Sequence, residues 1–60
     1  MKYSELHRKI VRNGWTLLRV KGSHYIYTKN GENYTTPYHG AKEIGEGLRK
    51  QIIKEMELTK

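Results

Sequence analysis

Three histidines are the side chains of this 60-residue chain that could exchange protons at neutral pH: His7, His24 and His39. An imidazole has an unperturbed pKa of about 6.5, so the ring can act as a general acid or a general base. His24 directly follows Gly22 and Ser23. Because glycine lacks a side chain, an anion such as a phosphate can approach the main chain closely beside that imidazole. The sequence therefore offers one position where proton transfer and anion binding could coincide.

Each histidine also has a structural interpretation. On spacing alone, His24 is more simply a strand residue whose ring bonds a neighbouring carbonyl group. His39 lies in a loop close to Pro37, where it could transfer a proton, bind a phosphate or serve the fold. His7 is expected on the exposed side of an N-terminal helix, in contact with solvent. The three histidines lack the short ligand spacings of zinc sites and the chain has no cysteine, so we expect no metal and no cofactor.

Two helices are predicted from apolar residues that recur at helical spacing. The first is expected over residues 5–12, where Ser4 can cap its N-terminus and Asn13-Gly14 ends it. The second is expected over residues 46–57. The apolar residues that define the two helices are Leu6, Ile10 and Val11, and then Leu48, Ile52, Ile53 and Met56.

Three strands are predicted between the helices, over residues 15–21, 24–29 and 32–37. Aromatic and β-branched residues dominate the first two, which a short turn at Gly22-Ser23 separates. Asn30-Gly31 favours the type I′ turn of a tight hairpin, and Pro37 closes the third strand because it cannot donate a ladder hydrogen bond. This order predicts a two-layer α+β fold, α-β-β-β-α, with both helices on one face of an antiparallel sheet.

The side chains that face the helices are less well defined by the pattern. Trp15, Leu17 and Ile26 are expected to point inward. Leu17 and Leu18 are adjacent, however, and strict alternation cannot place both of them on the same face.

Charge and composition restrict the class of protein. Twelve Lys and Arg against six Asp and Glu give a formal net charge of +6, which suits a polyanion or an acidic protein partner, or else simply keeps a small domain soluble. A single domain over residues 1–60 is expected from the length, with a thin core. The absence of cysteine and of a secretory signal or apolar span favours the cytoplasm and no membrane association.

Several segments together resemble the HicA family of toxin ribonucleases, and the match covers nearly the whole chain. The most specific segment is Gly22-Ser23-His24 at the start of the second predicted strand, followed later by Pro37-Tyr38-His39-Gly40. Gly14-Trp15, Lys21 and Leu48-Arg49 complete the set. Gly47 departs from the Thr or Pro that such proteins often place before the Leu-Arg pair, which leaves the start of the second helix open.

The resemblance implies a fold similar to the double-stranded-RNA-binding domain, an activity that cuts mRNA, and His24 as the catalytic residue. Cleaving RNA without a metal needs one group to take a proton from the 2′-hydroxyl and another to protonate the leaving 5′-oxygen. Histidine suits both roles, and such proton transfer contributes about 10²- to 10⁴-fold in rate. Lys21 and Lys29, with the backbone amides of Gly22 and Ser23, are expected to stabilise the charge that develops on phosphorus.

The RNA itself is expected to be held mainly through its phosphates, by Lys21, Gly22, Ser23, Lys29, His39, Arg49 and Lys50. Further cations on the first helix are Arg8, Lys9 and Arg12. Four tyrosines could stack on unpaired bases, although cross-strand packing is expected for at least half of them: Tyr25, Tyr27, Tyr34 and Tyr38.

The resemblance also implies a protein partner, a HicB-type antitoxin encoded alongside, whose acidic residues could cover His24. The chain is expected to be monomeric when free and to form a hetero-oligomer with the antitoxin. Two other functions remain open on the sequence. One is a non-catalytic RNA-binding module in which His24 is only a contact, and the other is a protein-interaction domain with little affinity for RNA.

Overall fold

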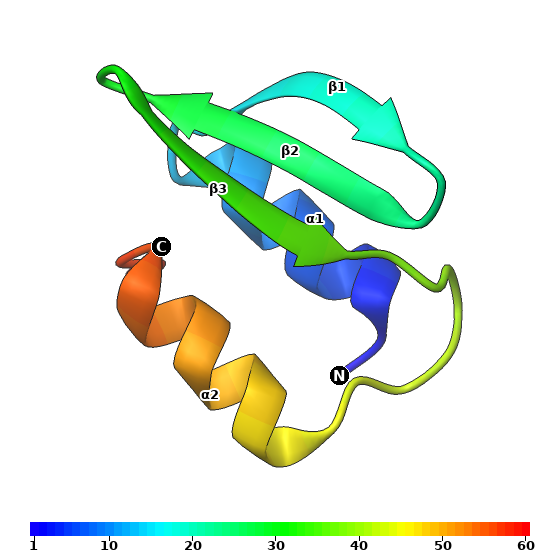
Figure 1. Ribbon diagram of the computed structural model, residues 1–60. Helices are drawn as coiled ribbons and strands as arrows, with labels where there is room; N and C mark the ends of the chain where they lie inside the picture. Colours follow the sequence, from blue (N-terminus) through cyan, green and yellow to red (C-terminus); the bar gives the residue numbers. More distant parts are fainter.

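The computed structural model describes residues 1–60 and contains two helices and three strands (Figure 1). Their order is α1 (Tyr3–Arg12), β1 (Thr16–Lys21), β2 (His24–Lys29), β3 (Glu32–Pro37) and α2 (Glu46–Glu55). The strands form an antiparallel sheet in the order β1-β2-β3, so β2 is central and β1 is an edge. Both helices lie on the same side of this sheet. The two-layer α+β fold predicted from the sequence is therefore confirmed.

The helices differ from the prediction mainly at their ends. Helix α1 begins at Tyr3, so Ser4 lies inside the helix and is not its N-cap. The first amides of α1 are satisfied by the loop before α2 instead: the backbone N–H of Tyr3 donates to the carbonyl of Lys42 at 3.0 Å and that of Ser4 to Gly40 at 3.0 Å. These carbonyl groups are far along the chain, so the residues around Ser4 could not indicate where the helix begins. Neither helix has the length and apolar character needed to cross a membrane.

The hairpin between β2 and β3 agrees with the prediction residue by residue. Asn30 and Gly31 have φ values of +51° and +83°, the left-handed backbone that both central positions of a type I′ turn require. Lys29 therefore pairs with Glu32 at the turn, and the ladder continues until His24 pairs with Pro37. This register fixes which residues of β3 lie beside His24.

The core lies between the helices and the inner face of the sheet. Trp15 is buried as predicted, and its indole N–H donates to the carbonyl of Met56 at 3.1 Å. Of the other two inward predictions, the one for Ile26 is wrong, because Ile26 points to the opposite face. Leu17 does point to the helix side, as the partner of Tyr27, but its side chain is 43% exposed there. The buried hydrophobic residues are Leu6, Ile10, Trp15, Tyr27, Ile44, Ile52, Met56 and Leu58.

Thr36 on β3 has a buried hydroxyl that no other group of the protein bonds. The side chain is 0% exposed and its Oγ1 lacks a hydrogen-bond partner. Burying an unpaired hydroxyl costs about 1–3 kcal/mol. We therefore expect Thr36→Val, which keeps the shape of the side chain, to raise the free energy of unfolding by about 1 kcal/mol, as measured by urea unfolding with Trp15 fluorescence. The exposed Thr35→Val serves as the control, and a Thr36→Val protein no more stable than the parent would contradict the prediction.

Candidate functional site

His24 lies on the face of the sheet that the helices leave uncovered. Successive side chains of a strand point to opposite faces, so Tyr25 and Tyr27 face the helices while His24 and Ile26 face outward. An open cavity of about 600 Å³ marks this outer face around the start of β2. The residues that line it are Arg19, Lys21, Gly22, His24, Ile26 and Thr35.

Two cations of β1 share this cavity because of an irregularity in the ladder. Lys21 pairs with His24 and Arg19 with Ile26, and cross-strand partners point to the same face. Farther along, Leu17 pairs with Tyr27, so Leu18 is an extra residue in a β-bulge. Regular alternation from an inward Leu17 would have turned Arg19 and Lys21 toward the helices. The bulge reverses the phase and brings both cations to the side of His24.

Arg19 is the candidate site residue that was not predicted from the sequence. The available signal was its position two residues before Lys21, which places both side chains on one face of any regular strand. That signal becomes useful only when the face of Lys21 is known. In the structure, Arg19 is exposed and adds a guanidinium, the group best suited to bidentate binding of a phosphate, to the wall of the cavity.

The turn before His24 is open to solvent. Gly22 has a φ of +62°, a left-handed backbone that favours glycine, and a Cβ built there would meet nothing within 4 Å. Ser23 is exposed, and its carbonyl accepts the backbone N–H of Tyr38 at 2.8 Å. The space above this turn is therefore free for an anion to approach the main chain beside His24.

Lys29 does not join this site. It lies at the opposite end of β2 from His24, and five residues of extended strand span roughly 16 Å. Its Nζ donates to the backbone carbonyl of Asn13 at 2.8 Å, next to Gly14 on the helix side of the sheet. Lys29 therefore binds the start of the α1–β1 connection. The second cation of the His24 cavity, predicted to be Lys29, is Arg19.

The remaining predicted RNA contacts lie away from the His24 cavity. His39 is exposed on the connector, where its ring and the Tyr3 ring pack at nearly a right angle with a centroid distance of 4.9 Å. Arg49 and Lys50 are on α2, in the helical layer, and the Lys50 ammonium pairs with Glu46 at 3.0 Å. These cations can contribute to the general positive field, but they do not surround the same point as His24.

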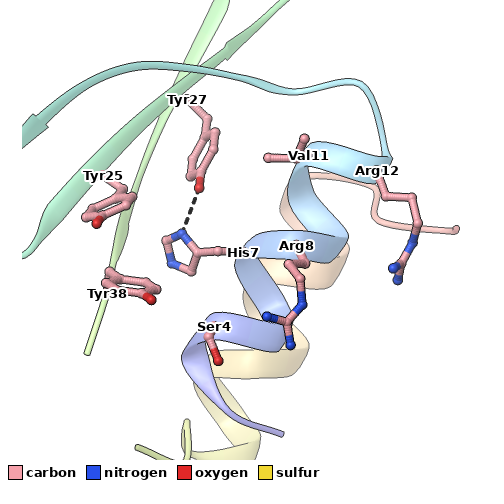
Figure 2. A pocket seen from close by; sticks show the side chains of 8 residues that line it. All are labelled: Ser4, His7, Arg8, Val11, Arg12, Tyr25, Tyr27 and Tyr38. Atoms are coloured by element: carbon pink, nitrogen blue, oxygen red, sulfur yellow. Dashed lines mark hydrogen bonds between the residues drawn. The ribbon is translucent and has the colours of Figure 1, made fainter. Parts of the chain in front are cut away.

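His7 is buried, in contrast to the solvated position expected for it (Figure 2). Its Nε2 lies 2.9 Å from the carbonyl oxygen of Pro37, which can only accept, so Nε2 carries the proton. Its Nδ1, 2.8 Å from the hydroxyl of Tyr27, is then the acceptor of that hydroxyl's hydrogen bond. Burial lowers the pKa of His7 below 6.5, and the hydrogen bond to Pro37 offsets part of this effect. His7 is a neutral structural histidine that joins α1 to β2 and β3.

The tyrosines serve mainly the fold. Burial, together with neighbouring Tyr25 and Tyr38, raises the pKa of Tyr27 to about 12, so its hydroxyl stays protonated as a donor to His7. Tyr34 donates to the carboxylate of Glu55, and burial followed by this bond raises the pKa of Tyr34 to about 12. Tyr25 and Tyr38 stack on each other at 4.7 Å between ring centroids.

Arg19, Lys21 and His24 therefore lie together on the outer face, with the imidazole exposed on the central strand. His7 forms hydrogen bonds within the protein, whereas His24 and His39 are both exposed. Of these two, His24 is the one that shares a cavity with Arg19 and Lys21. No three His, Asp or Glu side chains converge in an arrangement that could hold a metal ion. The site can move a proton beside a bound anion.

Comparisons with known proteins agree on one family. The profile described as "HicA toxin of bacterial toxin-antitoxin" matches residues 3–58. A curated protein of Pseudomonas fluorescens (strain Pf0-1), named "Probable mRNA interferase HicA", is 48% identical over 58 residues, which is 97% of this chain and 97% of that protein. No solved structure is significantly similar to this chain.

Proposed function

Because this chain belongs to the HicA toxin family, we propose that it is the toxin of a toxin–antitoxin system and that it cuts mRNA in the cytoplasm, with His24 moving the proton. The relative's name, mRNA interferase, supports an endoribonuclease activity. The proposed role of His24 rests on one observation: its side chain lines the same surface cavity as Arg19 and Lys21. A base beside two cations can accept the 2′-hydroxyl proton while the cations bind the phosphate that is attacked.

The proposed reaction is an internal transfer at phosphorus. The neutral imidazole of His24 takes the proton of the ribose 2′-hydroxyl as that oxygen bonds to phosphorus. The bond from phosphorus to the 5′-oxygen breaks, and the leaving oxygen takes up a proton from solvent. The products are a 2′,3′-cyclic phosphate and a 5′-hydroxyl. Arg19 and Lys21 stabilise the extra negative charge on the phosphoryl oxygens while the bonds exchange.

The donor set favours a reaction that needs no metal. Arg19, Lys21 and His24 are cationic or neutral groups that bind phosphate directly, whereas a hard divalent cation such as Mg²⁺ prefers carboxylate oxygens. With a net charge of +6, the chain should grip RNA through its backbone. We further propose that the partner is a HicB-type antitoxin and that the free toxin is a monomer.

Purified chain incubated with a labelled single-stranded RNA in excess EDTA tests this function. We expect cleavage that leaves 2′,3′-cyclic phosphate ends and that weakens with salt, because affinity falls by roughly 0.7 log units per phosphate contact per decade of salt. The matched control is the same oligonucleotide with 2′-deoxyribose at the cut position, which cannot form the cyclic product. Binding without cleavage under every condition would instead identify a non-catalytic RNA-binding module.

A further inference from the structure

A second cavity lies on the other side of the sheet from His24, between α1 and the tyrosines of the sheet (Figure 2). It has a volume of about 590 Å³ and an apolar floor that includes Tyr25 and Tyr38. Val11, Arg8 and Arg12 line its α1 side. Together with the adjoining strand β1, this cavity is called the α1–β1 groove below.

The apolar surface of the groove continues onto β1. Val20 pairs with Tyr25 and Leu17 with Tyr27, so both aliphatic side chains point to the same face as these tyrosines. Val20 is 48% exposed, Leu17 is 43% exposed and Val11 is 56% exposed. The core contains only 8 hydrophobic residues, yet three further aliphatic side chains are exposed together on this side of the protein. Such a patch is typical of a binding surface.

The backbone of β1 offers a second means of binding. Because β1 is an edge strand, one side of it carries backbone N–H and C=O groups that pair with no other strand. An extended peptide can add to such an edge through main-chain hydrogen bonds, with its alternate side chains entering neighbouring pockets. The cavity over Tyr25 and Tyr27 lies on β2, the strand next to this edge, and can receive such a side chain.

The charge at the rim indicates what kind of peptide would bind. Arg8 and Arg12 are exposed on α1, and the protein's two ion pairs lie elsewhere, between the N-terminal amine and Glu43 and between Lys50 and Glu46. Both guanidinium groups therefore remain available to carboxylates of a partner. An acidic segment with apolar residues at alternate positions complements both the rim and the floor.

We propose that the α1–β1 groove binds an extended acidic segment of the antitoxin, which adds a strand to β1 and inserts an apolar side chain over Tyr25. This inference rests on the proposed toxin–antitoxin function. A protein segment fits better than RNA, because Val11, Leu17 and Val20 extend the tyrosine floor with exposed aliphatic surface, which apolar side chains cover better than phosphates or base edges do. The groove and His24 lie on opposite faces of the sheet, so anchoring of the antitoxin is separate from any covering of the catalytic residue.

The test compares Leu17→Glu and Val20→Glu with the parent for binding to the purified antitoxin encoded beside this chain. Both side chains are exposed, so the variants should fold, as checked by circular dichroism. We expect each to weaken antitoxin binding at least tenfold while the rate of RNA cleavage stays within twofold of the parent. The matched control is Leu48→Glu, an exposed leucine on α2 that should leave antitoxin binding within twofold of the parent.

Hydrogen exchange of the parent, with and without antitoxin, provides a second measurement that needs no variant. Amides of β1 should become protected in the complex. Unchanged antitoxin affinity in both variants, unprotected β1 amides, or a parent that does not bind the antitoxin would overturn the proposal. A loss of RNA affinity alone would assign the groove to RNA. If the parent cuts no RNA but antitoxin binding still depends on Leu17 and Val20, the catalytic proposal fails and this one stands.

Discussion

Replacing His24 with alanine is expected to slow RNA cleavage by about 10²- to 10⁴-fold, the usual contribution of one positioned acid or base. The side chain is exposed and contributes nothing to the core, so the fold should be unchanged. Arg19 and Lys21 remain in the cavity, and affinity for RNA should therefore stay within about twofold. Single-turnover cleavage of a labelled RNA gives the rate, and a binding titration with the 2′-deoxy oligonucleotide gives the affinity.

His39→Ala is the matched control for this prediction. Its ring rests on Tyr3, on the connector rather than in the His24 cavity, so its removal should change the cleavage rate by less than about threefold. Induced expression of the parent and of each variant, with total mRNA followed over minutes, extends the comparison to cells. A His24→Ala protein that cuts RNA as fast as the parent would remove His24 from the mechanism.

Replacing His7 with alanine is expected to lower the free energy of unfolding by about 3 kcal/mol. The change removes a buried ring, leaves a cavity and deprives the hydroxyl of Tyr27 and the carbonyl of Pro37 of their partners. A core of this size rarely supplies more than about 3–5 kcal/mol in total. Most of the His7→Ala protein should therefore be unfolded at 37 °C, as measured by urea unfolding with Trp15 fluorescence.

The buried histidine also gives the protein a defined pH dependence. The pKa of His7 is lowered on folding, so the unfolded chain binds more protons in the interval between the folded pKa and 6.5. The stabilisation is complete above pH 6.5 and decreases as the pH falls below that value toward the folded pKa. His7→Gln, which can still donate to Pro37 but does not titrate, should be less stable than the parent and should lose less stability on acidification from pH 7.5 to 5.5. Equal losses in the two proteins would contradict this explanation.

The order of the elements and much of the site could be predicted from local sequence. Strands β2 and β3 have the predicted bounds because Asn30-Gly31 determines the turn and Pro37 the end, and both signals are local. The start of α1 was predicted two residues too late. Its first amides bond the carbonyls of Gly40 and Lys42, which are far along the chain.

Hydropathy could not predict that His7 is buried and Val11 is exposed. The two residues lie one turn apart on the same side of α1, and a hydropathy scale favours burial of the valine. The structure buries His7 and leaves Val11 exposed, because Tyr27 and Pro37 supply hydrogen bonds to both ring nitrogens. Whether the His7 ring can be buried depends on its hydrogen-bond partners on β2 and β3. The positions of these partners are known only once the register of the sheet is known.

The inward prediction for Ile26 was wrong, and alternation alone could not predict the faces of Leu17 and Lys21 together. Leu17 was expected inward and Lys21 beside His24, yet regular alternation cannot satisfy both expectations, since the two residues are an even number of positions apart. The bulge at Leu18 satisfies them together and adds Arg19 to the site. Bulges depend on packing across strands and leave little trace in a single sequence.

The extra residue at Leu18 also makes the first hairpin intolerant of sliding. A fully regular hairpin can shift its partner strand by two residues and still present the same side chains to each face. Here a shift would move the bulge relative to β2, so no other alignment keeps Leu17 over the tyrosines and both cations beside the imidazole. Loop insertions at Gly22-Ser23 should consequently impair the proposed activity even when the strands survive, because the two cations and the imidazole would no longer be aligned with one another.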